Sequence, residues 1–273
     1  MIKASWLISV LVFLAFSFKA KGQEADTIQS NKIITNAQMI SIGAVNILDT
    51  YLSPEKYTGT ELRYMSHTIR EREGSRWSRL LLHQGNVSYS NNRADNANFV
   101  AGAYTFSYGV HYNWNFLDNR LNIKAGAQAD VNLGFLYSTR NSNNPAQAKL
   151  SLDISPSASA TYRFRLWNRP FSLRYEASVP FVGIMFSPNY GQSYYEIFTQ
   201  GNYDHNVVPT TLISTPSLRQ MLTLDFTLNR TTLRVGYLGD YRQSDVNSLK
   251  YHSYSNMFVI GIVRHFKLTK IVP

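Results

Sequence analysis

The chain has 273 residues, no cysteine, and a formal net charge of +10 from 27 lysines and arginines against 17 aspartates and glutamates. The absence of cysteine excludes disulfides, thiolate metal ligands and lipid attachment to a cysteine. Mean hydropathy is −0.23 although aromatic residues make up 14% of the chain, which is typical of a sequence that alternates apolar and polar side chains.

The N-terminus carries the pattern of a secretory signal peptide. Lys3 precedes an apolar run from Trp6 to Phe18, and small residues follow within positions 20–22. This run is too short to span a membrane as a mature helix. We therefore expect a signal peptide over residues 1–22, cleavage near Gly22, and a periplasmic segment over residues 23–36.

Residues 103–116 alternate between large apolar and small polar side chains, which predicts a β-strand with two different faces. The polar face contains no Lys or Glu, unlike the solvated face of a soluble sandwich. In an outer-membrane barrel the large apolar face meets lipid and small polar residues line the lumen. The apolar face comprises Tyr104, Phe106, Tyr108, Val110, Tyr112, Trp114 and Phe116.

Further segments repeat this alternation and predict an all-β fold, a transmembrane antiparallel outer-membrane β-barrel over residues 37–268. Clear alternation occurs in 121–137, 148–166, 171–185, 218–228, 231–241 and 254–268, and weaker alternation in 38–52, 58–72 and 76–91. Ten strands would return both termini to the periplasm. Twelve strands would result if residues 194–199 and 207–213 pair as a hairpin inside a long outer loop, 187–215.

Three short turns keep the apolar faces matched across hairpins. Turns at Asp118–Asn119, Asn168–Arg169 and Asn229–Arg230 would place Trp114 opposite Ile123, Arg163 opposite Arg174, and Asp225 opposite Arg234. A slip by one residue would bring apolar residues opposite polar ones. The longer polar connections, expected on the outer side, are 91–98, 138–147, 187–216 and 242–253.

Motifs for catalysis or metal binding are weak. The six histidines lack metal-ligand spacing, so we expect neither a metal nor another cofactor. Ser66–His67 and His252–Ser253 are adjacent pairs whose side chains would point to opposite faces of a strand. Asp204–His205 resembles the Asp–His pair of the omptin proteases, but its spacing differs and no Asp-x-Asp accompanies it.

Charged residues on the predicted polar faces form a lumen charge cluster. Buried charges in a narrow barrel must pair to offset desolvation, which is the favoured interpretation. The alternative is an anion-selective constriction, since rings of Arg and Lys select anions. The cluster comprises Lys124, Arg163, Arg165, Arg174, Glu176, Asp225 and Arg234.

Three stretches resemble a known family: "ILDTYLSPEKYTG" (47–59), "FSPNYGQSYYEIF" (186–198) and "SLRQMLTLDF" (217–226). They are similar to an uncharacterised family of Bacteroidetes outer-membrane β-barrels, domain of unknown function 3316. The resemblance implies an outer-membrane location and brings no activity. With a Ser53–Pro54 turn on the outer side, the first two stretches could meet at one rim. The candidate outer-rim surface comprises Asp49, Tyr51, Glu55, Tyr57, Tyr194, Tyr195, Glu196, Asp204 and His205.

These observations predict an integral barrel of a Gram-negative outer membrane that serves in surface binding or envelope structure. The alternatives are an outer-membrane hydrolase acting on lipid or peptide at the rim, and a small passive pore. Expected partners are outer-membrane lipid and an extracellular glycan or peptide ligand. A basic exported protein meets acidic head groups sooner than nucleic acid, and we expect a monomer.

Overall fold

The computed structural model describes residues 32–142, 144–229 and 231–268. The predicted signal peptide and most of the predicted periplasmic segment lie outside these ranges. The first strand already begins at Lys32, inside the stretch 23–36.

The described residues form twelve strands and one short helix. None of them forms a helix with the length and hydrophobicity needed to cross a membrane. The elements are β1 (Lys32–Asp49), β2 (Ser53–Arg72), β3 (Trp77–Asn92), β4 (Asn98–Phe116), β5 (Leu121–Ser138), β6 (Ala146–Leu166), β7 (Arg169–Ser178), β8 (Val182–Phe186), α2 (Tyr194–Phe198), β9 (Val207–Thr211), β10 (Leu218–Leu228), β11 (Thr231–Val246) and β12 (Leu249–Leu268).

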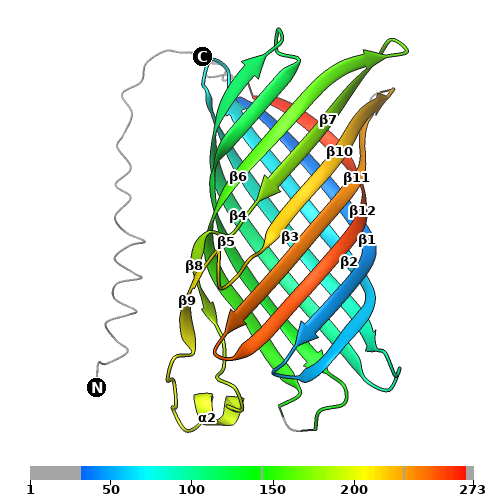
Figure 1. Cartoon of the computed structure of the whole chain (residues 1–273). Coiled ribbons are helices and arrows are strands. Elements are labelled where there is room, and N and C mark those ends of the chain that lie inside the picture. Colours follow the sequence, from blue (N-terminus) through cyan, green and yellow to red (C-terminus); the bar gives the residue numbers. More distant parts are fainter. Residues whose placement is uncertain (1–31, 143, 230, 269–273) are drawn as a thin grey trace.

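Ten of the strands close into an antiparallel barrel, as predicted (Figure 1). Strands β1 to β7 pair in chain order, β7 pairs with β10, and β12 returns to pair with β1. Strand β8 continues along β6 beyond the end of β7, and β9 pairs with β8. The predicted hairpin of 194–199 with 207–213 is therefore wrong, because the first segment contains α2 and β9 pairs with β8 instead.

Both termini of the described chain lie at one end of the barrel, with the turns 73–76, 117–120 and 167–168 and the end of β10 at Leu228. The longer connections, including the α2 loop 187–206, lie at the other end (Figure 1). We take that end as the outer one, because outer-membrane barrels carry short turns on the periplasmic side.

Two predicted connections differ from the structure at the outer end. β11 and β12 extend through most of 242–253 and join through Asn247–Ser248, whose positive φ angles of 52° and 59° fit a two-residue hairpin turn. The first outer turn is Thr50–Leu52, and β2 already includes Ser53 and Pro54. In both places the alternation continues closer to the turn than the polar composition indicated.

The predicted register is confirmed in two hairpins and wrong in one. Trp114 faces Ile123 and Asp225 faces Arg234, as expected. Arg163, however, faces Ser172, because the turn is Trp167–Asn168, both with positive φ. A turn placed one residue earlier shifts the register by two, and such a shift keeps the faces matched. The alternation pattern therefore could not distinguish the two turns.

Outward and inward faces separate as the sequence predicted. Tyr104 is 43% exposed on the barrel exterior, whereas the neighbouring inward Ser107 is 1% exposed. Large apolar side chains are exposed around the whole wall, among them Ile40, Leu133, Ile154, Leu222, Phe258 and Ile260. So large an apolar exterior is the surface of a barrel that faces hydrocarbon.

Part of the interior is apolar, which explains the weak alternation in 38–52, 58–72 and 76–91. Inward positions of β1, β2 and β3 carry apolar side chains, so both faces of these strands read as apolar. We call the inward cluster the methionine plug, after its four methionines. It comprises Ala37, Met39, Met65, Leu82, Met221, Leu238, Met257, Val259 and Val263.

The exterior gives a direct prediction about stability. Ile260 is 53% exposed on β12, so a charged residue there would be harmless in a soluble protein. In a lipid-facing wall Ile260→Arg should lower the free energy of unfolding by about 2–4 kcal/mol. Denaturant titration of the barrel folded in vesicles measures this. Tyr203→Arg in the exposed outer loop is the control and should change little; equal effects of both substitutions would contradict a lipid-facing wall.

Candidate functional site

An ion-pair layer crosses the lumen on the outer side of the methionine plug. The Arg63 guanidinium donates to Glu61 at 2.6 Å and to Asp240 at 2.5 Å, and all three side chains are buried. Ser255 on β12 donates to the second oxygen of Glu61 at 2.5 Å. These bonds connect β2 with β11 and β12 through the interior, because each charge needs a partner once it leaves water.

A second ion-pair layer is centred on Glu176 of β7. Its carboxylate contacts Arg174 at 2.9 Å, Arg219 at 3.3 Å and His67 at 3.3 Å. His67 comes from β2, so this layer joins one wall of the barrel to the wall that contains β7 and β10. Together with the methionine plug, the two layers occupy most of the middle of the lumen, where a small cavity of about 30 Å³ remains beside His67 and Glu176.

A second apolar cluster fills the lumen near its outer mouth, and we call it the outer cap. Tyr57 and Phe99 stack with ring centroids 3.6 Å apart at its centre, and both are almost fully buried. The outer cap comprises Val45, Ile47, Leu52, Tyr57, Ala97, Phe99 and Leu136. Burial of these apolar side chains removes apolar surface from water at the mouth.

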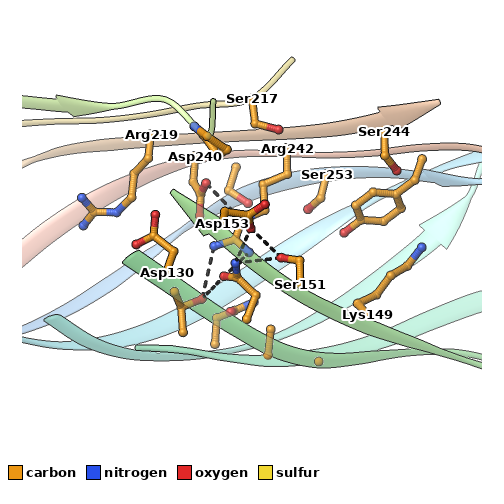
Figure 2. A pocket seen from close by; sticks show the side chains of 18 of the residues that line it. Asp130, Lys149, Ser151, Asp153, Ser217, Arg219, Asp240, Arg242, Ser244 and Ser253 are labelled. Carbon is orange, nitrogen blue, oxygen red and sulfur yellow. Dashed lines mark hydrogen bonds and ion pairs between the residues drawn. The ribbon is translucent and has the colours of Figure 1, made fainter. Parts of the chain in front are cut away.

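Between the outer cap and the central layers lies a cavity of about 170 Å³, which we call the outer cavity. In Figure 2, Asp240 and Arg242 come from one wall, and Asp130, Ser151 and Lys149 from the wall opposite, while the Arg219 guanidinium points away from them. Ser217, Ser244 and Ser253 add hydroxyl groups. The cavity is thus lined by acidic, basic and hydroxyl side chains.

Two carboxylates of the outer cavity have no basic partner within hydrogen-bond distance among the described residues. Asp130 and Asp153 are register partners across β5 and β6. Asp130 accepts from Gln128 at 2.7 Å and Ser155 at 2.5 Å, and Asp153 from Ser151 at 2.7 Å. The six other charged side chains in the lining are in ion pairs: Arg63 with Asp240 and Glu61, Arg242 with Asp240, Lys149 with Asp49, and Arg219 with Glu176.

The barrel wall beside the outer cavity is weakly bonded, and we call this place the seam. It lies between residues 212–217, which join β9 to β10, and residues 242–246 of β11. Strand β10 pairs with β11 only up to Tyr241. Pro216 lies just before β10, and its backbone has no N–H that could donate a hydrogen bond to a neighbouring strand.

Three hydrogen bonds span the seam. Asp245 N–H donates to the Ser214 carbonyl at 2.9 Å. Gln243 N–H donates to the Ser217 hydroxyl at 3.1 Å, and that hydroxyl donates to the Gln243 carbonyl at 3.4 Å. Ser217 and Gln243 both line the outer cavity, so the seam is its side wall. On the exterior Leu212 and Ile213 are 42% and 92% exposed.

Part of the predicted outer-rim surface comes together. The Tyr51 hydroxyl donates to the Gln192 carbonyl at 2.9 Å, and the Tyr51 and Tyr194 rings meet edge to face at 6.0 Å. The Tyr194 hydroxyl accepts from Ala148 N–H at 2.7 Å. Burial raises the pKa of Tyr194 to about 12 and raises that of Tyr51 further. Both hydroxyls stay neutral and serve as structural hydrogen-bonding groups for the α2 loop.

The other predicted rim residues take separate places. Glu55 accepts from Asn92, Tyr57 lies in the outer cap, and Tyr195 is exposed. Glu196 accepts from the Ser193 N–H and hydroxyl at the start of α2, which lowers the pKa of its carboxyl. Asp49 contacts Lys149 at 2.6 Å, so its role is to pair a charge at the lumen wall.

Asp204 and His205 form a pair at 2.5 Å near the end of the α2 loop, shortly before β9. Their side chains are 73% and 81% exposed, so this pair lies in bulk water. In the described ranges no three His, Cys, Asp or Glu residues gather as metal ligands would.

The predicted lumen charge cluster lies in the periplasmic half of the barrel and in the Glu176 layer. Lys124 pairs with Glu71 at 2.5 Å and Arg234 with Asp225 at 2.6 Å. Arg163 donates to the Asn119 carbonyl at 3.1 Å. Together with Arg165 these residues line a second cavity of about 890 Å³.

Sequence reasoning missed the charges of the outer half, namely Glu61, Arg63, Asp130, Asp153, Arg219, Asp240 and Arg242. All of them occupy inward positions of their strands. Following the inward–outward alternation along each strand from a clearly assigned part would therefore have placed them in the lumen. Arg63 was hidden because Met65 and Ile69 occupy the same inward face of β2 and blur the alternation.

Comparisons with known proteins give a family. The family model described as "Protein of unknown function (DUF3316)" matches residues 7–271. No curated protein matches the chain. One similar solved structure is the transport unit of the autotransporter AIDA-I from Escherichia coli, with 8% identity over 95% of this chain and 97% of that chain, at a TM-score of 0.47.

Two other outer-membrane proteins are similar at the same level. The outer membrane protease OmpT from Escherichia coli has 7% identity over 91% of this chain and 100% of that chain, at a TM-score of 0.42. The COG4313 outer membrane channel from Pseudomonas putida F1 has 9% identity over 92% of this chain and 100% of that chain, at a TM-score of 0.30.

The central ion pairs give a prediction about stability. Arg63→Met leaves Glu61 and Asp240 buried without their cation and should lower the free energy of unfolding by about 3–5 kcal/mol. Lys267→Met is the matched control, because its partner Glu73 lies 3.7 Å away and both side chains are more than half exposed. Its loss should amount to less than about 1 kcal/mol. Denaturant titration of the folded barrel separates the two; similar losses would mean that Arg63 is not desolvated.

Proposed function

Because the family match makes this chain a member of the DUF3316 family, which carries no assigned activity, we propose a function from geometry alone. The protein is a surface-binding barrel of the outer membrane that takes the polar head of an amphiphile into its outer cavity. The observation that carries this proposal is the position of the outer cavity. It lies between the outer cap and the central ion-pair layers, and its side wall is the seam.

The charge of the outer cavity favours a head group with an amine. Asp130 and Asp153 face each other with only neutral donors bonded to them. Two carboxylates close together in a water-poor site are stabilised by a cation, because opposite charges offset the cost of leaving water. Arg242 lies nearby, where it donates to Asn132 at 2.9 Å and pairs with Asp240 at 3.4 Å, and its remaining N–H groups would contact an anionic or hydroxyl group of the same ligand.

The size of the outer cavity favours a head group rather than a whole lipid. Its volume of about 170 Å³ is smaller than the roughly 300–1,000 Å³ that is typical of pockets for drug-sized ligands. An acyl chain must therefore remain outside. The exposed Leu212 and Ile213 flank the seam on the exterior, where a chain leaving the cavity would meet an apolar surface.

The alternative functions receive less support. A passive pore needs a continuous wide water path, whereas the methionine plug and two ion-pair layers leave a cavity of only about 30 Å³ in the middle of the lumen. A Ser–His hydrolase needs both side chains on one face. His67 points inward to Glu176 while Ser66 bonds Gln38, and His252 bonds Asn46 while Ser253 lines the outer cavity.

The head-group proposal predicts the effect of neutralising the carboxylates. Asp130→Asn/Asp153→Asn keeps the shape and should weaken binding of lysophosphatidylethanolamine at least about tenfold, since a charge-assisted hydrogen bond contributes about 1.5–3 kcal/mol. Native mass spectrometry of the detergent-solubilised barrel measures retained lipid. Asp204→Asn is the control for a lost surface charge. Equal binding of lysophosphatidylglycerol, which has no amine, would contradict the role assigned to the two carboxylates.

A second prediction concerns the route by which lipid enters the outer cavity through the seam. Because the chain has no cysteine, Ser214→Cys/Asp245→Cys introduces the only two thiols, at positions whose backbones are bonded at 2.9 Å. Crosslinking them should slow lipid loading and release, and reduction should restore both rates. The same crosslink between Asn91→Cys and Asn98→Cys, which face each other across β3 and β4, is the control. Unchanged loading through a crosslinked seam would rule out the lateral route.

A further inference from the structure

The periplasmic half of the lumen contains a second cavity of about 890 Å³, which we call the basic basin. It lies between the short turns and the central layers, and strands β5, β6, β7, β10 and β11 contribute most of its lining. His67 and Arg174 of the Glu176 layer form part of its inner end. The central layers lie between the basic basin and the outer cavity.

Charge in the basic basin is strongly unbalanced. Six basic side chains line it against two acidic ones, Glu71 and Asp225. Glu176 lies behind Arg174 and balances that residue only in part, because it also contacts Arg219 and His67. The basic side chains are Arg120, Lys124, Arg163, Arg165, Arg174 and Arg234.

The basic side chains differ in depth and in pairing. Lys124, Arg174 and Arg234 are buried and each contacts a carboxylate. Arg120, Arg163 and Arg165 are exposed toward the mouth of the basin, and no carboxylate in the described ranges lies within ion-pair distance of them. The mouth thus holds a concentration of positive charge that attracts an anion inward.

Arg234 has a buried N–H group without a hydrogen-bond acceptor in the described part of the chain, which is a second observation in favour of a bound anion. Its side chain lies at the base of the basin and is 3% exposed. Nε and Nη2 donate to Asp225 at 2.6 and 2.7 Å. Nη1 is buried and has no acceptor among the described residues. A buried donor without an acceptor costs free energy, and an oxygen of a bound anion would remove that cost.

We propose that the basic basin binds a multivalent oxyanion from the periplasmic side, with phosphate as the group that fits best. A guanidinium presents paired N–H donors that match two oxygens of one phosphate. The exposed Arg163 and Arg165 contact the anion first, and Arg234 bonds it at the base. This site lies on the opposite side of the central layers from the outer cavity, so it does not depend on the proposed amphiphile.

The test is calorimetric titration of the full chain in a maltoside detergent, with inorganic pyrophosphate and inorganic phosphate as probes at low ionic strength. Saturable binding of pyrophosphate is expected, and it should weaken as salt is raised. Arg163→Gln/Arg165→Gln should lower the affinity at least about tenfold. Arg169→Gln is the control, because this arginine begins β7 at the same end of the barrel but does not line the basin.

The outcomes separate a built site from a general attraction to positive charge. An equal loss in the Arg169 variant, or no saturable heat at millimolar pyrophosphate, would overturn the proposal. A second arm repeats the titration in nanodiscs with and without phosphatidylglycerol. Competition by that lipid identifies a lipid head group as the phosphate source, and its absence identifies a soluble anion. Because Arg163 and Arg165 are exposed, their replacement is not expected to prevent folding, and heat-modifiable mobility of the variant verifies this.

Discussion

Closure of the backbone hydrogen-bond ladder is the constraint on which the rest of this structure depends. A chain in hydrocarbon has no water to satisfy its N–H and C=O groups, so each strand must bond two neighbours. The described strands meet this requirement around nearly the whole circumference. The exception is the seam, where a hydroxyl, Ser217, replaces regular strand pairing. The seam therefore departs from regular strand pairing at the place where the wall borders the outer cavity, which is why the proposed function uses it as the lateral route.

The second constraint is the narrow lumen. A ten-stranded barrel fills its interior with side chains, and the charges among them must pair. Here the pairs join distant strands: Arg63 links β2 to β11, and His67 and Arg174 meet at Glu176. These contacts divide the lumen into an outer cavity with two carboxylates that lack a basic partner and a basic basin with excess arginine.

The sequence predicted the architecture because lipid and lumen impose opposite chemistry on alternate residues of a strand. It failed where that contrast disappears, as around Met39 and Met65, where both faces are apolar. It also failed at the turn beside Asn168, because a register shift by two keeps every face matched. The sequence could not indicate that Asp130 and Asp153 face each other, since this depends on the β5–β6 register. The prolines near positions 180 and 216 were the available signal of the seam.

Accessibility of spin labels tests the lipid-facing exterior most directly. Single cysteines at Ile154 and Ile260, on β6 and β12, would each carry a nitroxide in reconstituted vesicles, with Tyr203 of the α2 loop as the aqueous reference. The account predicts frequent collisions with oxygen and rare collisions with a water-soluble nickel chelate at both wall positions, and the reverse at Tyr203. If the chelate reached Ile154 and Ile260 as readily as Tyr203, the apolar exterior would face water, and the membrane-spanning barrel would be contradicted.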